Sequence, residues 1–394
     1  LPGIRIYLYC PYPMLIRENV PLAPLTTMGV GGAARYFAEA ESDAEVVEAV
    51  GFARSLDDDP NEHRTGARWG SRPDHPSEHK PGARWLRREL PLFVMGGGSN
   101  VVVADAGFAG LVLKIGIRDV AQFPGPDGTI TFTVGAGCDW DALVARTVAA
   151  GCGGLECLSG IPGSVGGTPV QNVGAYGQEV SDTIQEVRVL DRYSLEIRAL
   201  SNAECRFGYR SSIFNTTERG RYVILRVSFA VRHGAGPNIR YADLQQFLAG
   251  RSGAPTLSEV RAAVREIRHR KAMLIVPGDE DARSVGSFFR NPVLPQAFVE
   301  QLSAQLARRG LQLPSYAAAD GFRKLPAAWL VEHAGFAKGY SKGRAGISRK
   351  HALAIVNRGG ATAAEIIALG DEIQKRVLDE FGIRLEPEPE LLGF

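Results

Sequence analysis

The chain has few cysteines, no excess of either charge and no long apolar run. Its 45 Lys and Arg against 43 Asp and Glu leave a formal charge of +2, which argues against nucleic acid as the main partner. No stretch reaches the roughly 18 apolar residues that span a bilayer, so we expect no membrane segment. The five cysteines form no CxxC pair and have no paired histidines beside them. We therefore expect no metal site, no disulfide framework and a reducing, cytoplasmic location. The cysteines are Cys10, Cys138, Cys152, Cys157 and Cys205.

The N-terminus also lacks the pattern of a signal peptide. The apolar run in residues 1–10 is too short, and no small-residue cleavage site follows it. We interpret Met14 as the translation start and residues 1–13 as an upstream extension. The length of 394 residues exceeds the roughly 250–300 at which a single core stops growing, so we expect two or three domains.

Two glycine-rich loops are the most informative feature of the sequence. Residues 161–177 include five glycines and two prolines and almost no charge, unlike a solvated linker. Such a backbone suits a bulky ligand that lies against the main chain, with amide groups turned toward its anionic part. Upstream, Gly96–Asn100 follows the apolar run 90–95 and precedes Val101–Val103. Two such loops indicate a phosphate-bearing cofactor.

The usual nucleotide-binding loops do not describe Gly96–Asn100. A dinucleotide fingerprint needs a helix directly after the glycines, whereas Val101–Val103 is prone to form a strand. No Gly-Lys-Ser/Thr follows, so the Walker pattern is absent as well. A strand–loop–strand arrangement would bind phosphate through loop amides. Taken alone, a plain tight turn explains the loop equally well.

The remaining pattern predicts an α+β fold. Ser42 and Glu45 form a capping box before a helix with Val46, Val47 and Val50 on its buried face. Val260, Val264 and Ile267 have helical spacing in a basic helix over 257–271. The last helix is capped by Thr362 and Glu365, is ended by Gly382, and buries Ile366, Leu369, Ile373, Val377 and Phe381. We expect a further helix over 141–150, and strands over 111–115, 129–134, 186–191, 222–231 and 383–386. Because the elements do not alternate as βαβ units, we do not expect a doubly wound sheet.

A segment at 56–88 interrupts this pattern. Glu62–Trp69 recurs sixteen residues later as Glu78–Trp85 in a charged stretch that is rich in Pro and Gly. Two copies are too few for a solenoid, so we interpret the segment as a duplicated, disordered surface insertion. Its histidines, His63, His75 and His79, are either metal ligands or solvated side chains of the insertion, and we favour the second interpretation.

Three other stretches place polar groups where chemistry is plausible. Cys205–Ser212 sets guanidinium groups beside aromatic rings, Gly286–Pro292 sets a serine between a glycine and two phenylalanines, and Leu385–Glu390 carries three acids. Each has an ordinary explanation, respectively surface pairs, a turn serine and a solvated tail. No Gly-x-Ser-x-Gly elbow marks the serine as a nucleophile. Spacing alone does not decide between these alternatives.

Taken together and in order, the motifs resemble the UDP-N-acetylenolpyruvoylglucosamine reductase family (MurB) of bacterial wall synthesis. The similarity covers roughly residues 22–393 apart from the insertion. The motifs that carry it are Gly96–Asn100, Ile161–Gly167, Gln171–Gly177, Phe207–Phe214, Gly286–Pro292 and Leu385–Glu388.

The resemblance implies an α+β protein with two subdomains that bind FAD, of the vanillyl-alcohol-oxidase type, and a C-terminal α+β substrate domain. On this sequence the first subdomain spans residues 22–118 (with the insertion at 56–88) and the second spans 119–268. The substrate domain spans 269–394, with its last strand packing back toward the FAD subdomains. The implied reaction uses NADPH to reduce FAD, which then reduces the enolpyruvyl group of a nucleotide sugar. We expect a monomer.

The resemblance also assigns the reacting groups. Ser287 matches the family's proton donor, and Arg210 and Glu388 match its other two catalytic groups. A vinyl ether accepts hydride poorly until its conjugated carboxylate is polarised, and a fixed guanidinium stabilises the charge that develops there. A serine hydroxyl is a weak acid, but proximity lets it protonate a strongly basic, enolate-like carbon. Glu388 assists only if it is protonated or paired with Arg210.

The remaining site residues follow from the same motifs. Tyr241 matches a tyrosine that covers the substrate, Lys271 matches a lysine that contacts the diphosphate, and Asn291 and His351 match other substrate positions. Without the resemblance, Tyr241 is a half-buried core aromatic, Lys271 a solvated helix end and His351 a satisfied polar group. We assign to the cofactor Gly96, Gly97, Gly98, Ser99, Asn100, Ile161, Pro162, Gly163, Ser164, Gly166, Gly167, Gly174 and Tyr176.

Some features depart from the family pattern. Gly97 stands where members with the covering tyrosine often have glutamate, and the chain stops at Phe394 without the longer tail of some members. Two rival functions remain open: another FAD-linked oxidase of the same fold, or a module that binds nucleotide sugars without redox chemistry.

Overall fold

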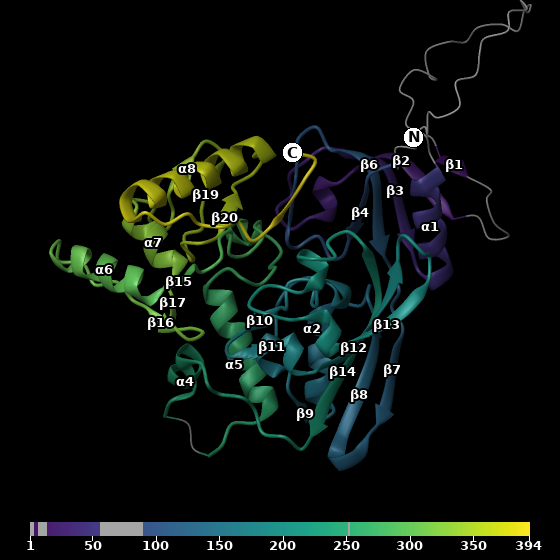
Figure 1. Ribbon diagram of the computed structural model, residues 1–394, viewed down its shortest axis with the longest axis horizontal. Coiled ribbons are helices and arrows are strands. Elements are labelled where there is room, and N and C mark those ends of the chain that lie inside the picture. Colours follow the sequence, from purple (N-terminus) through teal and green to yellow (C-terminus); the bar gives the residue numbers. More distant parts are fainter. Residues whose placement is uncertain (1–3, 7–13, 56–89, 251–252) are drawn as a thin grey trace, which may run out of the picture.

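The computed structural model describes residues 4–6, 14–55, 90–250 and 253–394 (Figure 1). The duplicated segment with its three histidines therefore lies outside the described residues, as does most of the 1–13 segment. Within the described ranges, no helix has both the length and the apolar character needed to cross a membrane.

The N-terminal strands form a five-stranded mixed sheet, which contains the predicted strand 111–115. Its strands are, in spatial order, β1 (Ile4–Ile6), β2 (Leu15–Pro21), β3 (Ala33–Ala40), β6 (Phe108–Ile115) and β4 (Leu92–Met95). Pairing is antiparallel from β1 to β3 and parallel between β3, β6 and β4. Helix α1 (Asp43–Ser55) packs on β3 and β6 and buries Val46 and Val50.

Helix α1 begins with only half of the predicted capping box. Ser42 Oγ accepts a hydrogen bond from the Glu45 amide at 3.3 Å, as predicted. The Glu45 carboxylate, however, accepts from the Glu41 amide at 2.5 Å and not from Ser42. Because β3 ends at Ala40, Glu41 is the first residue whose amide lies beyond the strand pairing, and it takes the carboxylate.

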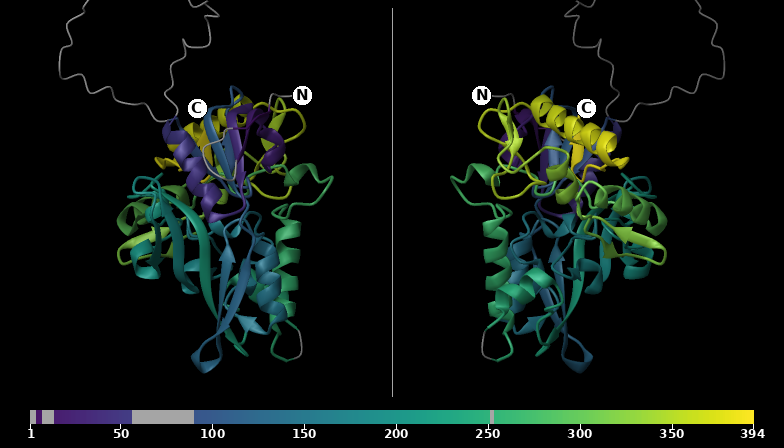
Figure 2. Two further views of the ribbon diagram at one scale, coloured as in Figure 1. Left: turned by 90° about the vertical axis from the view of Figure 1, so that its right-hand side faces the viewer. Right: turned by 90° about the vertical axis from the view of Figure 1, so that its left-hand side faces the viewer.

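The second sheet is antiparallel and contains the other three predicted internal strands. Its spatial order is β13 (Ile197–Ser201), β12 (Ile184–Asp191), β14 (Tyr222–His233), β8 (Thr129–Gly135) and β7 (Val120–Pro124), with β9 (Cys152–Gly153) also paired to β14. Helix α2 (Trp140–Ala149) follows β8, and α5 (Leu257–Arg270) runs beside α2 (Figure 2). Both helices confirm their predictions to within one residue.

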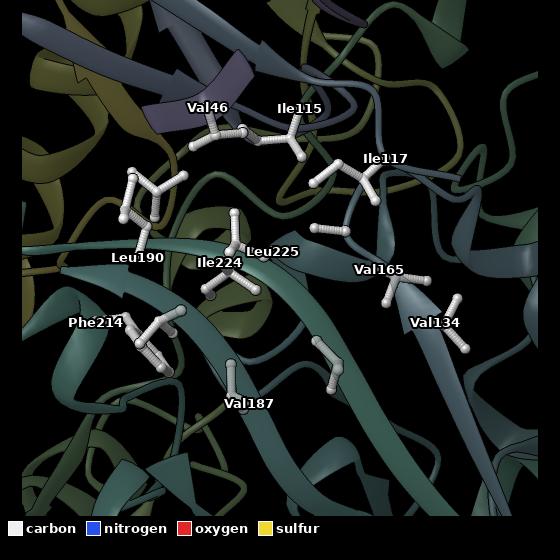
Figure 3. Packing of buried hydrophobic residues seen from close by; sticks show 14 of the residues in the cluster. Val46, Ile115, Ile117, Val134, Val165, Val187, Leu190, Phe214, Ile224 and Leu225 are labelled. Carbon is white, nitrogen blue, oxygen red and sulfur yellow. The ribbon is translucent and has the colours of Figure 1, made fainter. Parts of the chain in front are cut away.

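The two sheets share one hydrophobic core, which fixes them relative to each other. Figure 3 shows Val46 of α1 and Ile115 of β6 approaching Leu225 of β14 in this core. All three side chains are at most 5% exposed. Burying a side chain of this size contributes about 1.5–3 kcal/mol, so the loops that leave these strands start from a rigid base.

The C-terminal region has its own core, and the chain's N-terminal part contributes to it. Met28, Val30 and Val102 pack into a cluster made mainly of residues beyond 284. The last helix confirms its prediction, with a Thr362–Glu365 capping box and Gly382 in the left-handed conformation at φ 68°. The region's elements are β15 (Val293–Pro295), α6 (Gln296–Ala307), β16 (Tyr316–Ala317), β17 (Phe322–Lys324), α7 (Ala327–His333), β18 (Ser341–Lys342), β19 (Ala345–Ile347), β20 (Ile355–Asn357) and α8 (Ala363–Phe381).

The strand predicted at 383–386 is wrong, and the final strand lies further on. Ile383 and Leu385 are buried, which produced the alternating pattern, but this extended segment forms no regular ladder. Pro387 and Pro389 lack the amide donors that a ladder needs. After them, β21 (Glu390–Leu392) pairs in parallel with β5 (Val101–Val103), directly behind the first glycine-rich loop. The remaining short elements are β10 (Gly174–Ala175), β11 (Gln178–Glu179), α3 (Asn202–Cys205) and α4 (Ala242–Leu248).

Candidate functional site

A cavity of about 400 Å³ lies where the two glycine-rich loops meet the C-terminal region. It is lined by side chains or backbone from three parts of the chain that are far apart in sequence. Of the predicted site residues, the cavity lining includes Ser99, Asn100, Ile161, Pro162, Gly174, Tyr176, Arg210, Tyr241, Lys271, Ser287, Asn291, His351 and Glu388.

The glycines of the two loops allow the loops to touch each other. A Cβ added at Gly97 would lie 2.6 Å from the Cα of Gly163, and one at Gly96 would lie 2.5 Å from Ser164 Oγ. Ser99 Oγ donates a hydrogen bond to the Pro162 carbonyl at 3.0 Å across the same contact. Since no larger residue fits at Gly97 without moving the other loop's backbone, this pair of loops is a single packed unit.

Several residues that the sequence assigned to the cofactor do not line the cavity of about 400 Å³, which we call the main cavity. Gly98 has φ +66° and backs onto the Leu25 carbonyl, 2.0 Å from where a Cβ would stand. Gly97 instead lines a neighbouring cavity of about 560 Å³, next to residues 24–27 and 275–283. The others that do not line the main cavity are Gly96, Gly163, Ser164, Gly166 and Gly167.

The polar groups of the loops fit a phosphate-bearing cofactor such as FAD. The amides of residues 97–100 donate to no acceptor among the described residues, although the Gly98 and Asn100 carbonyls are both hydrogen-bonded. Ser164 Oγ is buried between the loops and likewise has no hydrogen-bond partner in the described chain. A buried hydroxyl without a partner is costly, so Ser164 calls for an external partner, and the amides of residues 97–100 are available to the same ligand. Consecutive free amides beside a cavity suit an anionic group.

Arg210 and Glu388 form an ion pair inside the cavity. Arg210 Nε lies 3.2 Å from Glu388 Oε1, and their side chains are only 21% and 15% exposed. A second hydrogen bond, from Arg210 Nη2 to the Gly174 carbonyl at 2.7 Å, fixes the guanidinium. Burial raises the pKa of the Glu388 carboxyl, and the charges of Arg210 and Arg290 act against that rise. Arg210 also has φ 52°, and such strain in a non-glycine residue is concentrated at functional sites.

Backbone pairing explains how Ser287 reaches the same cavity. The Phe288 amide donates to Leu353, the Phe288 carbonyl accepts from the Glu388 amide at 2.9 Å, and the Arg290 amide donates to Glu386. The segment after Ser287 is thus hydrogen-bonded to two other chain segments. One contains Leu353, two residues after His351, and the other carries Glu388. Positions a hundred residues apart become neighbours in this way.

The hydroxyl of Ser287 is hydrogen-bonded to His351. Ser287 Oγ and His351 Nε2 are 3.3 Å apart. Burial lowers the pKa of His351 to about 4, with further lowering by the charges of Lys271, Lys338 and Arg268. At neutral pH the ring is therefore uncharged, and its Nε2 either donates to the serine or accepts from it according to the tautomer.

The predicted substrate residues line the other end of the cavity. Tyr241 is 46% exposed and packs edge-on against Tyr176, with ring centroids 5.6 Å apart. Lys271 caps α5 and forms an ion pair with Asp243 at 2.8 Å. Asn291 Oδ1 accepts from the Ala327 amide at 2.9 Å at the start of α7, so part of its bonding capacity is structural.

Arg268 and Thr27 are among the cavity residues that were not predicted as site residues. Arg268 is buried and donates to the Gly160 and Met273 carbonyls, and burial lowers its pKa. The sequence could have indicated that Arg268 is buried, because residues 260, 264 and 268 follow one another at helical spacing on the buried face of α5. Thr27, which donates to the Ser284 carbonyl at 2.6 Å, carried no such signal.

This architecture defines a class: flavoproteins with an FAD-binding domain and an added C-terminal domain. A family model described as FAD binding domain matches residues 72–196, and one described as UDP-N-acetylenolpyruvoylglucosamine reductase, C-terminal domain, matches residues 278–392. The UDP-N-acetylenolpyruvoylglucosamine reductase of Thermobifida fusca is 44% identical over 381 residues, covering 95% of this chain and 98% of the relative. That of Nocardia farcinica is 43% identical over 384 residues, covering 96% and 90%.

The chain belongs to the UDP-N-acetylenolpyruvoylglucosamine reductase family. A crystal structure of the reductase from Thermus caldophilus matches the fold with a TM-score of 0.57 at 24% identity, over 99% of this chain and 100% of that one. The family and the fold class predicted from the sequence are both confirmed.

Proposed function

We propose that this protein reduces UDP-N-acetylglucosamine enolpyruvate to UDP-N-acetylmuramate, using NADPH and bound FAD, in the synthesis of peptidoglycan precursors. Family membership supports the reaction, and one structural observation supports the site. Ser287, Arg210 and Glu388 come from three distant segments and open onto one cavity beside the two glycine-rich loops. Because both co-substrates are charged nucleotides that do not cross membranes unaided, the enzyme acts in the cytoplasm where they are made.

The cofactor is held by the two loops. The free amides of residues 97–100 and the Ser164 hydroxyl would bind its phosphate and polar groups, and Ile161, Pro162 and Tyr176 would supply contacts to the rest of it. When bound, FAD supplies the hydride, which it takes from NADPH and passes to C3 of the enolpyruvyl group. We propose residues 22–118 and 119–268 as the two FAD subdomains, and residues 269–394 as the substrate domain.

Ser287 supplies the proton at C2. Its Oγ–H is the donor, and the oxygen left behind lies next to the Nε2 of His351 at 3.3 Å. The positive charges of Lys271, Lys338 and Arg268 lower the pKa of His351, and they therefore also act on the Ser287 hydroxyl beside it. Positive charge around the serine lowers the cost of the transient alkoxide, which is the main obstacle to using a weak acid as donor.

Arg210 and Glu388 polarise the substrate carboxylate. The guanidinium keeps donor hydrogens beyond those directed at Glu388 and Gly174, and these pair with the carboxylate conjugated to the vinyl ether. Glu388 is buried beside the guanidinium of Arg210. Because burial raises its pKa, the carboxyl group favours the protonated form when the substrate carboxylate binds. Lys271 and Tyr241 bind the diphosphate and cover the nucleotide end, with Asn291 and His351 on the same wall.

The test is NADPH consumption with the enolpyruvyl nucleotide sugar, compared between the native protein and Ser287→Ala. We expect the variant to keep flavin reduction by NADPH and to lose nearly all product formation. Equal turnover by both proteins would remove Ser287 from the mechanism. Purified protein without flavin absorbance would favour a non-redox binding module, and rapid oxygen reduction without the nucleotide sugar would favour an oxidase.

A further inference from the structure

A buried carboxyl group lies next to the tyrosine end of the cavity, and the proposed reaction does not use it. Glu156 is 0% exposed and sits in a short 3-10 turn, residues 156–158, that packs against both α2 and α5. No Lys, Arg or His of the described chain lies within ion-pair distance of it. Burying such a group without a cation is costly unless hydrogen bonds satisfy it.

Three N–H groups from separate segments satisfy the Glu156 carboxylate. Its Oε2 accepts from the Gly154 amide at 2.8 Å. Its Oε1 accepts from Gln178 Nε2 at 2.9 Å and from the Asn238 amide at 2.8 Å. Gln178 belongs to the β10–β11 hairpin that carries Tyr176, and Asn238 precedes Tyr241 by three residues. One carboxylate therefore joins the supports of both tyrosines.

Further bonds tie the same two segments together around Glu156. The Cys157 amide donates to Gln178 Oε1 at 2.8 Å, and Asn238 Nδ2 donates to the Gly177 carbonyl at 3.3 Å. Gly177 in turn lies against Tyr241, whose amide nitrogen is 3.9 Å from where a glycine Cβ would stand. The result is a closed network beneath the edge-to-face Tyr176–Tyr241 pair.

The segment that carries Tyr241 is held partly through its carbonyls. The Asn238 carbonyl accepts from Cys157 Sγ at 3.0 Å, and the Tyr241 carbonyl accepts from two amides in the first turn of α4. Residues 235–241 run between β14 and α4 without helix or strand. Within 236–241, the Asn238 amide is the only backbone donor bonded to another described residue. Tyr241 is itself 46% exposed, so its ring gains little from burial. The Asn238 amide is therefore the point at which the backbone donors of this segment are tied to the rest of the described chain, and Glu156 is its acceptor.

We infer that Glu156 is a positioning residue that holds Tyr241 in place over the nucleotide end of the substrate. It contacts no reacting atom and acts through the two segments it joins. The inference rests on the proposed function only for the identity of the ligand. Its effect falls on binding of the nucleotide sugar, since the hydrogen bonds of Glu156 reach neither the Gly96–Asn100 loop nor Ser287.

The test compares Glu156→Gln with Asp191→Asn. Asp191 is a control for the loss of a buried carboxylate, because it is also buried (2% exposed) and accepts from the Tyr193 and Ser194 amides, but at the end of β12 and away from the cavity. Unlike Glu156, it also forms an ion pair with Arg221 at 2.8 Å, so D191N should cost at least as much stability as E156Q. In E156Q an amide group must face one of the three N–H donors. We expect at least a fivefold rise in KM for the enolpyruvyl nucleotide sugar, with flavin reduction by NADPH within twofold of the native rate. D191N should leave both unchanged within twofold, whatever stability it loses.

A double-mutant cycle shows whether Glu156 acts through Tyr241. In a Tyr241→Ala background, E156Q should raise KM by less than twofold, because the ring it positions is gone. An undiminished effect in that background, an unchanged KM in E156Q, or an equal loss of flavin reduction would each overturn the inference. If E156Q does not fold, Gln178→Met removes one of the three donors to the same carboxylate. It should likewise raise KM for the nucleotide sugar and leave flavin reduction by NADPH within twofold of the native rate.

A measurement without substrate separates this inference from the proposed function. The Asn238 amide should exchange its hydrogen at least tenfold faster in E156Q than in the native protein, and at the native rate in D191N. Native protein that fails to reduce the nucleotide sugar but shows this exchange pattern would refute the proposed function and leave the network standing. Unchanged exchange in E156Q would refute the network itself.

Discussion

Replacing Arg210 by methionine tests the electrostatics of the site most directly. The substitution keeps an unbranched side chain of similar length but removes the cation 3.2 Å from Glu388 and the hydrogen bond to Gly174. Glu388 then keeps its burial and loses its nearest counter-charge. Its pKa, already raised by burial, must rise further, because Arg210 is the largest influence that opposes the rise.

The size of the effect follows from the geometry. Two unit charges about 4 Å apart attract by on the order of 4 kcal/mol at an effective dielectric constant of about 20. Removing one partner of a buried pair costs about 3–5 kcal/mol. Both side chains keep some solvent contact, so we expect R210M to lose about 2–4 kcal/mol of unfolding free energy at pH 8. Losing the Gly174 hydrogen bond accounts for only about 1 kcal/mol of this.

The sign of the pH dependence is fixed by the direction of the shift. A carboxyl whose pKa is raised in the folded protein binds more protons there than in the unfolded chain, so its contribution favours folding at low pH and is lost as pH rises. The penalty in R210M should therefore shrink toward about 1 kcal/mol at pH 5. Urea unfolding at pH 5 and pH 8 measures it.

Glu388→Gln provides the control. In an E388Q background no carboxylate remains to be stranded, so R210M should cost only about 1 kcal/mol at both pH values. A penalty that is the same at pH 5 and pH 8, and that is undiminished in the E388Q background, would refute the argument that a buried, paired carboxylate sits in this cavity.

Three further outcomes are expected. His351→Gln should remove a pH-dependent loss of stability. Because the pKa of His351 is lowered to about 4 in the folded protein, the unfolding free energy of the native protein falls by up to ~3 kcal/mol as pH drops from about 6.5 toward 4. Urea unfolding of the variant over this pH range should lack that fall. Gly97→Ala should weaken FAD binding at least tenfold in fluorescence titration, since its Cβ would meet the Gly163 backbone at 2.6 Å; Gly51→Ala, with no atom within 4 Å, is the control, and equal affinity in both variants would contradict the packed-loop argument. Leu225→Ala should cost about 2–5 kcal/mol without changing the pH profile of activity, because it opens the core shared by the two sheets; a loss below about 1 kcal/mol would show that this core is not tightly packed.

Local patterns in the sequence determined four of the helices and four of the strands. The spacing of Ile366, Leu369, Ile373, Val377 and Phe381, with caps at both ends, specified α8, because a helix boundary depends on side chains within one turn of it. Local patterns likewise predicted three strands of the second sheet, β8, β12 and β14, but not β7, β9 or β13. The same local logic misplaced the final strand, because Ile383 and Leu385 alternate in burial while the prolines after them withhold the amides needed for pairing.

The composition of the two loops was also sufficient to indicate a phosphate-bearing cofactor. It did not reveal which glycines face a ligand and which allow the loops to touch. That distinction depends on where Gly163 lies relative to Gly97, which is a contact between segments more than sixty residues apart. For the same reason, Thr27 and the network around Glu156 gave no clear signal in the sequence, whereas the helical spacing of Arg268 could have been read.

The sequence by itself determined the family, four of the helices, four of the strands and the kinds of side chain available for chemistry, since each of these depends on residues close together in the chain. Only the tertiary structure decided that Ser287, Arg210 and Glu388 open onto one cavity. The reason is physical: the backbone bonds that join Phe288 to Leu353 and to Glu388 are made between distant segments, and they form only after the cores beneath them have packed.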